Sequence, residues 1–489
     1  MLRACEEILS IGRRALYMDL LTNMSDSVVE YGIPPVEVLA MRQDPMFLDM
    51  PDAQGSIVEP PTLTEAARVV RPVRTQLEWT TRSLDQSLPE DHLARSIWAF
   101  VERLELDSFY GSVKAVTDGP GRPASDPKVL LALWVYATAD GVGSARQVAR
   151  LCLEHDAYRW LRGGVPINYH MLADFRVARK AELDELLSQI LASLMSSGLV
   201  KAERVAQDGV RLRAKAGSAS FRRKQRLSQF LQAARERVRQ LGEEREHPDP
   251  NRSAKERAAR ERAACERQER VERALAEMPE VEAIKEKQKR KLSKGKREKV
   301  SEARASTTDP EARVMKMADG GYRPAFNAQL ATDMDSQVIL GVSVVNQGTD
   351  LGLAAPMEAQ VAERTGRHPD EYVVDGGFAS LQDVVTLTQR GVTVYTPSRP
   401  PTGEVRGKDP TLPRSTDPPE VAEWRVRMGT QEAKALYRDR GASAECVNAQ
   451  VEGRYGLRQL PVRGLGRTLG ILLLVAVAHN LLRWIALTT

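Results

Sequence analysis

Cysteine and aromatic residues are scarce in this 489-residue chain: it has four cysteines, and aromatic residues make up 5% of it. The cysteines lie far apart, with no CxxC pair and no neighbouring histidine pair, at Cys5, Cys152, Cys265 and Cys446. This pattern argues against a disulfide framework and against a structural zinc site. It suits a reducing compartment, and we therefore expect a cytoplasmic protein.

Long hydrophobic runs are also missing, with one near-exception at the C-terminal end. The apolar run from Ile471 to Ala478 is interrupted by His479, Asn480 and Arg483. A bilayer span needs about 20 predominantly apolar residues. We therefore predict a buried C-terminal helix and no membrane partner. The first residues include acidic side chains and no long apolar core, which argues against a secretory signal.

Neither sign of charge dominates the chain as a whole. Its 71 Lys+Arg and 66 Asp+Glu leave a net charge of +5, which alone does not indicate a nucleic-acid partner. The basic excess is local, because residues 211–240 hold ten Lys+Arg and one Glu. We predict that this segment contacts DNA phosphates through residues that include Arg222, Arg223 and Lys224. The alternative is a solvated charged helix, which we favour beyond residue 240.

Composition divides the first 200 residues into two parts. We expect residues 1–70 to be an extension or linker of unknown role, because their prolines disfavour regular helix and central strand. Residues 71–200 are predicted to form a helical, DNA-end-binding domain. A Gly/Pro turn and three basic residues allow a helix-turn-helix arrangement, with an ordinary solvated helix face as the alternative. These basic residues are Arg176, Arg179 and Lys180.

Strand patterns begin after residue 200, and residues 201–489 are predicted to form a mixed α/β catalytic domain. A hairpin is expected around the polar turn Asp333–Ser336, followed by alternating helices and strands. Two insertions interrupt this domain. Residues 218–303 are a charged helical insertion, either two long helices folded back or a partly disordered arm, and residues 397–424 are a proline-rich loop.

Three acidic residues occupy positions suited to an active site. Asp208 is predicted to end a short strand, Asp375 ends the strand YVVD, and Glu445 lies on a C-terminal helix. Ligands gather at the carboxyl ends of strands in α/β sheets. Clustered carboxylates repel one another without cations, so together these three could hold two Mg²⁺ ions for phosphodiester chemistry. Spacing alone is weak support, because any long chain offers many acidic triples.

Several motifs, in order along the chain, resemble those of bacterial insertion-sequence transposases of the DDE type. The first is SDPKVLLALWVYA, similar to the N-terminal helical domain of that group. The others are AQDGVRLRAKAG (206–217), TTDPEARVMKMADGGYRPAFNAQLATD (307–333), VVDGGFAS (373–380), YRDRGASAECVNAQVEGRYGLRQLPVRG (437–464) and AHNLLR (478–483). Together they cover roughly residues 71–489 and are far more specific than any single motif.

The resemblance implies a fold and an activity. The fold would be a ribonuclease H-like mixed α/β sheet with a helical insertion, preceded by an all-helical domain. Asp208, Asp375 and Glu445 would be the catalytic, metal-binding triad for two Mg²⁺ ions, with Mn²⁺ as a substitute. The enzyme would cut DNA at the terminal inverted repeats of its element and join the freed 3′-OH to target DNA. We expect a homodimer on DNA, associated with the bacterial nucleoid.

The resemblance further implies that Tyr437 and Arg440, which precede Glu445, contact the DNA end. Arg438 lies on the same helix, and arginine grips phosphates with two parallel hydrogen bonds. In related groups with a Tyr–Arg–Glu–Lys pattern, the gap between Arg and Glu is one residue shorter. A lysine follows the Glu by seven positions in those groups, whereas Glu452 stands there in this chain.

Other functions remain open on the sequence alone. One is a catalytically inactive DNA-binding derivative of such a transposase, and another is a stand-alone nuclease that cuts without strand transfer. A third, from a different class, is a non-enzymatic charged helical scaffold built around residues 218–303. The scaffold predicts no affinity for nucleic acid, and the inactive derivative predicts binding without cleavage.

Overall fold

The computed structural model describes residues 81–111, 113, 123–246, 253–290, 292, 294–297, 300–378, 380–398 and 409–488. Contacts divide the chain into two units, Met1–Ser83 and Leu84–Thr489. The second unit is described below. The extension predicted for residues 1–70 lies outside the described residues.

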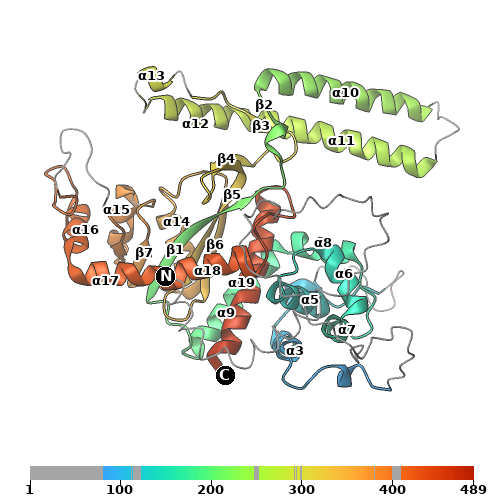
Figure 1. The fold of residues 1–489 in the computed structure, drawn as a ribbon, viewed down its shortest axis with the longest axis horizontal. Coiled ribbons are helices and arrows are strands. Elements are labelled where there is room, and N and C mark those ends of the chain that lie inside the picture. Colours follow the sequence, from blue (N-terminus) through green and yellow to red (C-terminus); the bar gives the residue numbers. More distant parts are fainter. Residues whose placement is uncertain are drawn as a thin grey trace, which may run out of the picture. The chain divides into compact units, whose positions relative to one another are not determined.

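The first part of this unit is helical, as predicted (Figure 1). Between residues 125 and 199 the chain forms five helices. Two of the breaks between them fall at His155, whose ring Nδ1 accepts the N–H of Ala157, and at Arg179. The elements are η1 (Asp85–Ser87), α3 (Leu93–Arg103), α4 (Asp107–Tyr110), α5 (Pro127–Ala139), α6 (Ala145–Glu154), α7 (Asp156–Arg162), α8 (Tyr169–Ala178) and α9 (Lys180–Ser196).

A mixed sheet follows, with strand order β4-β5-β1-β7-β8 and with β6 also paired to β5. β1 is antiparallel to β5 and parallel to β7, which is in turn parallel to β8. The order β6-β5-β1-β7-β8 with β5 reversed confirms the predicted ribonuclease H-like α/β class. The strands are β1 (Arg204–Arg213), β4 (Arg313–Lys316), β5 (Tyr322–Asp333), β6 (Ile339–Val345), β7 (Glu371–Val374) and β8 (Thr393–Tyr395).

Strand β1 is longer than the sequence predicted. It was expected to end at Asp208, but it continues to Arg213 because β5 pairs with it from Val205 to Arg213. On its other side, β7 pairs only with Arg204–Gln207. Asp208 therefore lies within a strand, at the point where the neighbouring parallel strand ends.

The remaining helices pack on this sheet. They are α14 (Ala354–Thr365), α15 (Leu381–Gln389), α16 (Pro419–Gly429), α17 (Gln431–Arg440), the π-helix η4 (Gly441–Glu445), α18 (Cys446–Ala449), the π-helix η5 (Gln450–Arg454) and α19 (Leu465–Thr488). Helix α16 begins inside the predicted loop 397–424, because Pro419 suits the first turn of a helix, where its missing N–H has no partner to lose.

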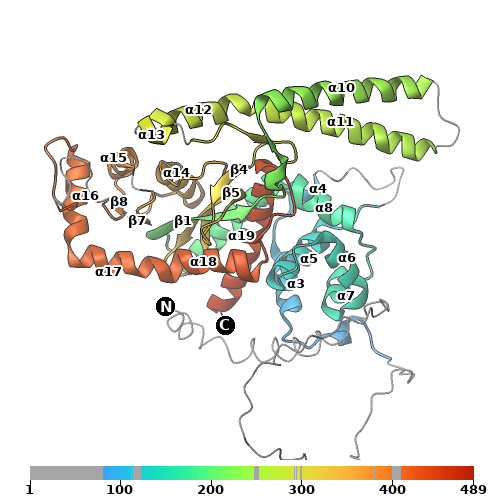
Figure 2. The ribbon, with the colours of Figure 1, turned by 45° about the horizontal axis from the view of Figure 1, so that its top comes forward.

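The charged insertion forms an antiparallel pair of long helices, α10 (Lys224–Glu246) and α11 (Ala254–Ala276), which lie side by side in Figures 1 and 2. Leu227, Ala234 and Leu241 are buried at intervals of seven residues along α10. This spacing keeps one narrow apolar stripe facing the partner helix. Shorter elements flank the pair: η2 (Ser218–Ser220), β2 (Phe221–Arg222), α12 (Met278–Arg290), α13 (Lys294–Arg297) and β3 (Ala305–Ser306).

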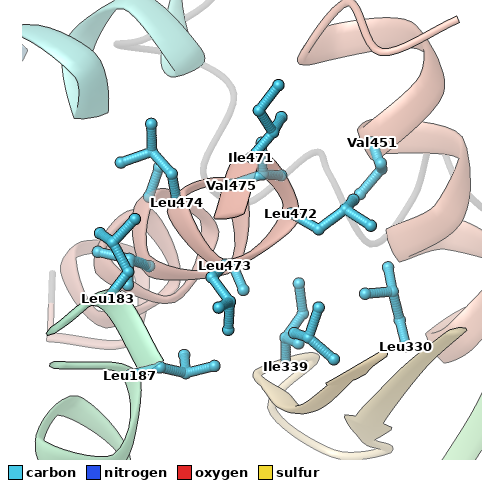
Figure 3. Packing of buried hydrophobic residues seen from close by; sticks show 14 of the residues in the cluster. Leu183, Leu187, Leu330, Ile339, Val451, Ile471, Leu472, Leu473, Leu474 and Val475 are labelled. Carbon is cyan, nitrogen blue, oxygen red and sulfur yellow. The ribbon is translucent and has the colours of Figure 1, made fainter. Parts of the chain in front are cut away.

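Helix α19 is long and apolar enough to cross a membrane by length and composition. In the structure it is a core helix, buried from Ile471 to Leu481. Figure 3 shows Leu472 and Leu473 among side chains of α9, β5, β6 and η5, which include Leu183, Leu187, Leu330, Ile339 and Val451. The predicted buried C-terminal helix is therefore confirmed.

The polar residues of AHNLLR fix the turn between β5 and β6. His479 Nε2 lies 2.8 Å from the carbonyl oxygen of Gln337, and Arg483 Nε donates to that of Ser336 at 2.8 Å. Asn480 bonds both the N–H and the C=O of Ile339. These bonds satisfy backbone groups that would otherwise be buried without partners.

His479 predicts a specific dependence of stability on pH. Its ring is fully buried, which lowers its pKa to about 4, and Tyr455 Oη lies 2.9 Å from Nδ1. Below pH 6.5, His479 is protonated in the unfolded chain, whereas in the folded chain it stays neutral until the pH approaches 4. The free energy of unfolding is therefore expected to be highest above pH 6.5 and to fall by about 3 kcal/mol toward pH 4 through this group.

Urea unfolding at several pH values between 7.5 and 4 checks this. His479→Gln removes the titrating group, so its stability should fall less steeply over the same range. Identical pH dependence in the two proteins would contradict the assignment.

Candidate active site

The sheet brings Asp208 and Asp375 to neighbouring positions where β7 ends. Gln207 of β1 pairs with Val374, the last residue of β7, and each aspartate is the next residue along the chain. Side chains alternate between the faces of a sheet, so Asp208 shares a face with Ala206, and Asp375 with Val373. Ala206 and Val373 pack with Ala444 of η4, which identifies that face. Both carboxylates therefore lie on the side covered by α17, η4 and α18.

Backbone groups hold the two carboxylates in place. Asp208 Oδ1 accepts the N–H of Gly209 at 2.9 Å, and Asp375 Oδ1 accepts that of Gly377 at 2.6 Å. Burial raises the pKa of Asp208, and the negative charge of Asp375 acts in the same direction, while Arg440 opposes both. The two acidic groups thus interact electrostatically in a region that favours added positive charge.

Glu445 reaches the same region because the helix that carries it changes its winding. Arg440 ends α17, and the π-helix η4 extends from Gly441 to Glu445. In an α-helix, residues five apart lie on different faces, whereas a π turn closes over five residues and places them on one face. The π turn therefore accommodates the extra residue between Arg and Glu. Figure 1 shows α17 and α18 running alongside β1 and β7.

Arg440 links the acidic residues. Its Nη2 donates to Glu445 Oε1 at 2.7 Å, and its Nη1 lies 3.7 Å from Asp208 Oδ2. The guanidinium lies 5.6 Å from the centre of the Tyr437 ring, and its side chain is 10% exposed. One cation is thus held between two carboxylates that come from a strand and from a helix far apart in the sequence.

A buried polar network supports the opposite face of the sheet behind Asp208. Gln207 Nε2 donates to Gln329 Oε1 at 2.9 Å, and Tyr372 Oη donates to Gln207 Oε1 at 2.8 Å. Gln329 and Asn327 both donate to Asp350 Oδ1, and Arg211 donates to the other oxygen of that carboxylate. The network fixes the side chains of Gln207 and Arg211. These two residues flank Gly209 on the face of the sheet opposite Asp208.

The basic residues predicted to bind DNA are not gathered at this site. Arg222 lies over the Phe230 ring, Arg223 pairs with Glu302 at 2.6 Å, and Lys224 pairs with Glu282 at 3.7 Å. Both ion pairs involve well-exposed side chains, and such pairs contribute little to stability. These basic groups can therefore exchange their partners for phosphate.

The helical domain places its three predicted residues differently. Arg176 is buried, donates to the carbonyl oxygen of Gly143 at 2.7 Å and lies over the Trp134 ring. It is a packing residue in this structure, because its position on α8 faces the core. Arg179 pairs with Glu182 at 3.0 Å, and Lys180 is exposed. The helix-turn-helix hypothesis thus loses one of its three basic contacts.

Asn448 belongs to the site although sequence reasoning missed it. This buried residue follows Glu445 by three positions, and its side chain acts to lower the pKa of Asp208, against the effect of burial. Residues three apart on a helix share a face, so a search for polar residues one turn from Glu445 would have found it. Gln207, Asn327 and Gln329 were missed too, and their signal was a polar residue at alternate positions of buried strands.

A divalent cation is implied by the carboxylates, and their chemistry fits one. Asp208, Asp375 and Glu445 offer the hard oxygen ligands that Mg²⁺ and Mn²⁺ prefer. The raised pKa of Asp208 is also what a carboxylate short of positive charge would have. Among the described residues, however, no group of three or more His, Cys, Asp or Glu side chains is close enough to hold a metal ion, and the Arg440 guanidinium lies between two of the carboxylates.

Two family models match the chain, in an order that agrees with the fold. Residues 82–178 match the Transposase domain (DUF772), and residues 414–485 match the Transposase DDE domain. These two matches support an insertion-sequence transposase of the DDE type. In this transposase the first match covers the helices α3 to α8, and the second covers α16 to α19 with Arg440 and Glu445. No curated protein and no solved structure matches it.

Proposed function

We propose that this transposase cleaves phosphodiester bonds at the ends of its element and joins the freed 3′-OH to target DNA. In cleavage, a water oxygen bonds to phosphorus and the bond to the 3′ oxygen breaks, leaving a 3′-OH and a 5′-phosphate. In strand transfer, that 3′-OH attacks a target phosphorus and a target 3′ oxygen leaves. We propose that the enzyme acts as a homodimer on DNA in the bacterial cytoplasm.

The observation that supports this proposal is Arg440, which pairs with Glu445 and lies 3.7 Å from Asp208, while Asp375 follows the strand that pairs with β1 just before Asp208. Two carboxylates come from neighbouring positions of parallel strands, and the third is brought to them by a π turn. Perturbed acidic groups in such a setting are typical of functional sites. A salt bridge with a purely structural role would not require a second aspartate, Asp375, beside Asp208.

The three carboxylates would hold two Mg²⁺ ions, or Mn²⁺ in their place. When bound, such ions activate the attacking oxygen and stabilise the leaving oxygen of an in-line displacement. β1 and β7 fix the positions of Asp208 and Asp375, so little reorganisation is needed when DNA arrives. Arg440 would turn from the carboxylates to the DNA phosphate, which frees their oxygens for the ions.

A pocket beside the site supports contact with a DNA end. Lys434, Tyr437 and Arg438 of α17 line it together with Pro397 and Met428. Two cations can neutralise phosphates, and an aromatic ring offers a stacking surface for a base. We propose that this pocket receives the element end, and that Arg222, Arg223, Lys224, Arg179 and Lys180 contact more distant phosphates.

Removing divalent metal is expected to stop cleavage without releasing DNA. Purified full-length protein is incubated with a labelled duplex that carries the terminal sequences flanking its own gene. Mg²⁺ should yield cut ends and joined products, and chelation with EDTA should abolish both, while a gel-shift assay still detects the protein–DNA complex. Mn²⁺ should restore the products.

The same experiment separates the alternatives. Cleavage without joined products would indicate a stand-alone nuclease, and binding without cleavage would indicate an inactive derivative. No affinity for DNA would leave only a scaffold role. Each of these outcomes would refute the proposed transposition chemistry.

A further inference from the structure

The stretch of chain between η5 and α19 carries positive charge that no acidic residue of the same stretch balances. Residues 453–468, called the arginine segment below, hold four arginines and no Asp or Glu. Arg454, Arg458, Arg463 and Arg467 are all exposed. Within the part of the chain that the structure describes, Arg458 and Arg467 make no ion pair and no side-chain hydrogen bond. Their charges are therefore available to a partner outside the chain.

The long helices of the insertion differ from the arginine segment in this respect. Helix α11 has seven basic and five acidic residues, and its Arg270 pairs with Glu266 at 3.6 Å. Between the helices, Arg235 of α10 pairs with Glu272 of α11 at 3.0 Å. Charge that is balanced locally produces only a weak field at a distance. The arginine segment has no such balance, and an unbalanced positive surface attracts a polyanion.

Buried side chains and hydrogen bonds fix the arginine segment on the protein. Tyr455 and Leu460 are 3% and 1% exposed. The N–H of Leu460 donates to the carbonyl oxygen of Arg213 at 2.8 Å, and Lys215 Nζ donates to that of Pro461 at 3.1 Å. The arginines therefore project to solvent from an anchored backbone, and Lys215 adds a further positive charge beside them.

Strand β1 connects the arginine segment with the candidate active site. β7 occupies one edge of β1 up to Gln207, the residue before Asp208. β5 occupies the other edge from Val205 to Arg213, so the bridge between Arg213 and Gln459 lies on the same edge as β7. Five residues of strand, about 17 Å, separate Asp208 from Arg213. At about 3.4 Å per base pair, a duplex that ends at Asp208 reaches the segment within about five base pairs.

Arg467 is poorly placed if its purpose is stability. It lies in the first turn of α19, where the helix dipole disfavours positive charge. Glu311 already supplies a carboxylate at this end of the helix, because its Oε2 accepts the N–H of Leu465 at 3.0 Å. A neutral or acidic residue would suit the position of Arg467 better, so a role in binding explains its charge better than a role in folding.

We propose that the arginine segment binds the phosphate backbone of duplex DNA beside the active site. Arginine binds phosphate with two parallel hydrogen bonds, and contacts of this kind position a duplex without reading its sequence. This inference rests on the proposed function, in which DNA is the substrate. The segment would hold the duplex behind the element end while that end lies at the carboxylates.

Binding of full-length protein to DNA is measured by fluorescence anisotropy over a series of NaCl concentrations, without divalent metal. The two labelled duplexes are the element end and a random sequence. Arg458→Gln combined with Arg467→Gln should weaken binding to both by a similar factor, about 10- to 100-fold near 0.1 M salt, and reduce the slope of log K against log salt by about 2. Its Tm should be unchanged or higher, because Arg467 no longer opposes the helix dipole.

Arg262→Gln combined with Arg267→Gln is the matched control, since it removes the same charge from exposed positions of α11. It should change the affinity less than about threefold, because acidic residues surround these arginines in the helix. Arg458→Lys combined with Arg467→Lys keeps the charge and should keep the wild-type slope. Equal weakening by the two glutamine pairs would overturn the inference. So would a lower Tm with an unchanged slope in the Arg458 and Arg467 pair.

A cleavage assay on the wild type separates this inference from the proposed function. If the wild type binds neither duplex, or does not cut the element end with Mg²⁺, the proposed function itself is refuted. If the wild type binds and cuts, and the glutamine pair at Arg458 and Arg467 binds DNA with the wild-type slope and affinity, the inference about the arginine segment fails alone.

Discussion

Asp208→Asn, Asp375→Asn and Glu445→Gln are each expected to lower the rate of Mg²⁺-dependent cleavage by at least about 10³-fold, equivalent to about 4 kcal/mol of transition-state stabilisation. Each amide keeps the size of the side chain and removes the negative charge that would hold a cation. The sheet and α17 do not depend on that charge, so folding should persist. The measurement is single-turnover cleavage of the element end.

Asp439→Asn is the matched control for this series. Asp439 is an exposed carboxylate on α17, directly before Arg440. Its loss should change the cleavage rate less than about threefold, because an exposed charge in water acts only weakly at a distance. DNA-end binding by the three site variants should equal or exceed that of the wild type, since repulsion of phosphate is reduced. Full cleavage by any of the three would refute its assignment.

Gly209→Ala is expected to destabilise the protein by about 3 to 5 kcal/mol. A Cβ at this position would lie 2.4 Å from Gln329 Nε2, 2.7 Å from Asp350 Oδ1 and 3.0 Å from Asn327 Oδ1. These atoms would have to move, and the buried hydrogen bonds that they make with one another would break. The midpoint and slope of urea unfolding give the change in free energy.

Gly217→Ala tests whether the effect is specific to this position. Gly217 has φ −87° and ψ 150°, and nothing lies within 4 Å of an added Cβ. An alanine there should be neutral or slightly stabilising, because it restricts the unfolded chain. Equal losses in the two variants would show that the network behind Asp208 does not determine the cost.

Several features of the fold follow from local patterns in the sequence. Apolar alternation around the polar turn at residue 333 predicted the β5–β6 hairpin, and polar interruptions in the run after Ile471 predicted a core helix. The helix break at His155 was less accessible, because this residue ends α6 and caps α7 with no proline or glycine to mark the break. Strand length was less accessible, because β1 continues to Arg213 only through its pairing with a distant strand.

The fate of the basic residues shows the limit of reasoning from charge alone. Arg176, Arg222 and Lys180 were all predicted from the sequence to contact DNA. The structure buries Arg176 against Trp134, places Arg222 over an aromatic ring and leaves Lys180 exposed. Which face of a helix is buried depends on the elements packed against it. Some of these elements lie 100 residues or more away in the sequence.

The sequence by itself determined the class of the fold and proposed the three acidic residues, because ordered motifs and strand ends are local features. The tertiary structure decided how these residues are arranged. Strand register placed Asp208 beside Asp375, and a π turn brought Glu445 to Arg440. Register and winding arise from contacts between distant segments, so no local pattern encodes them.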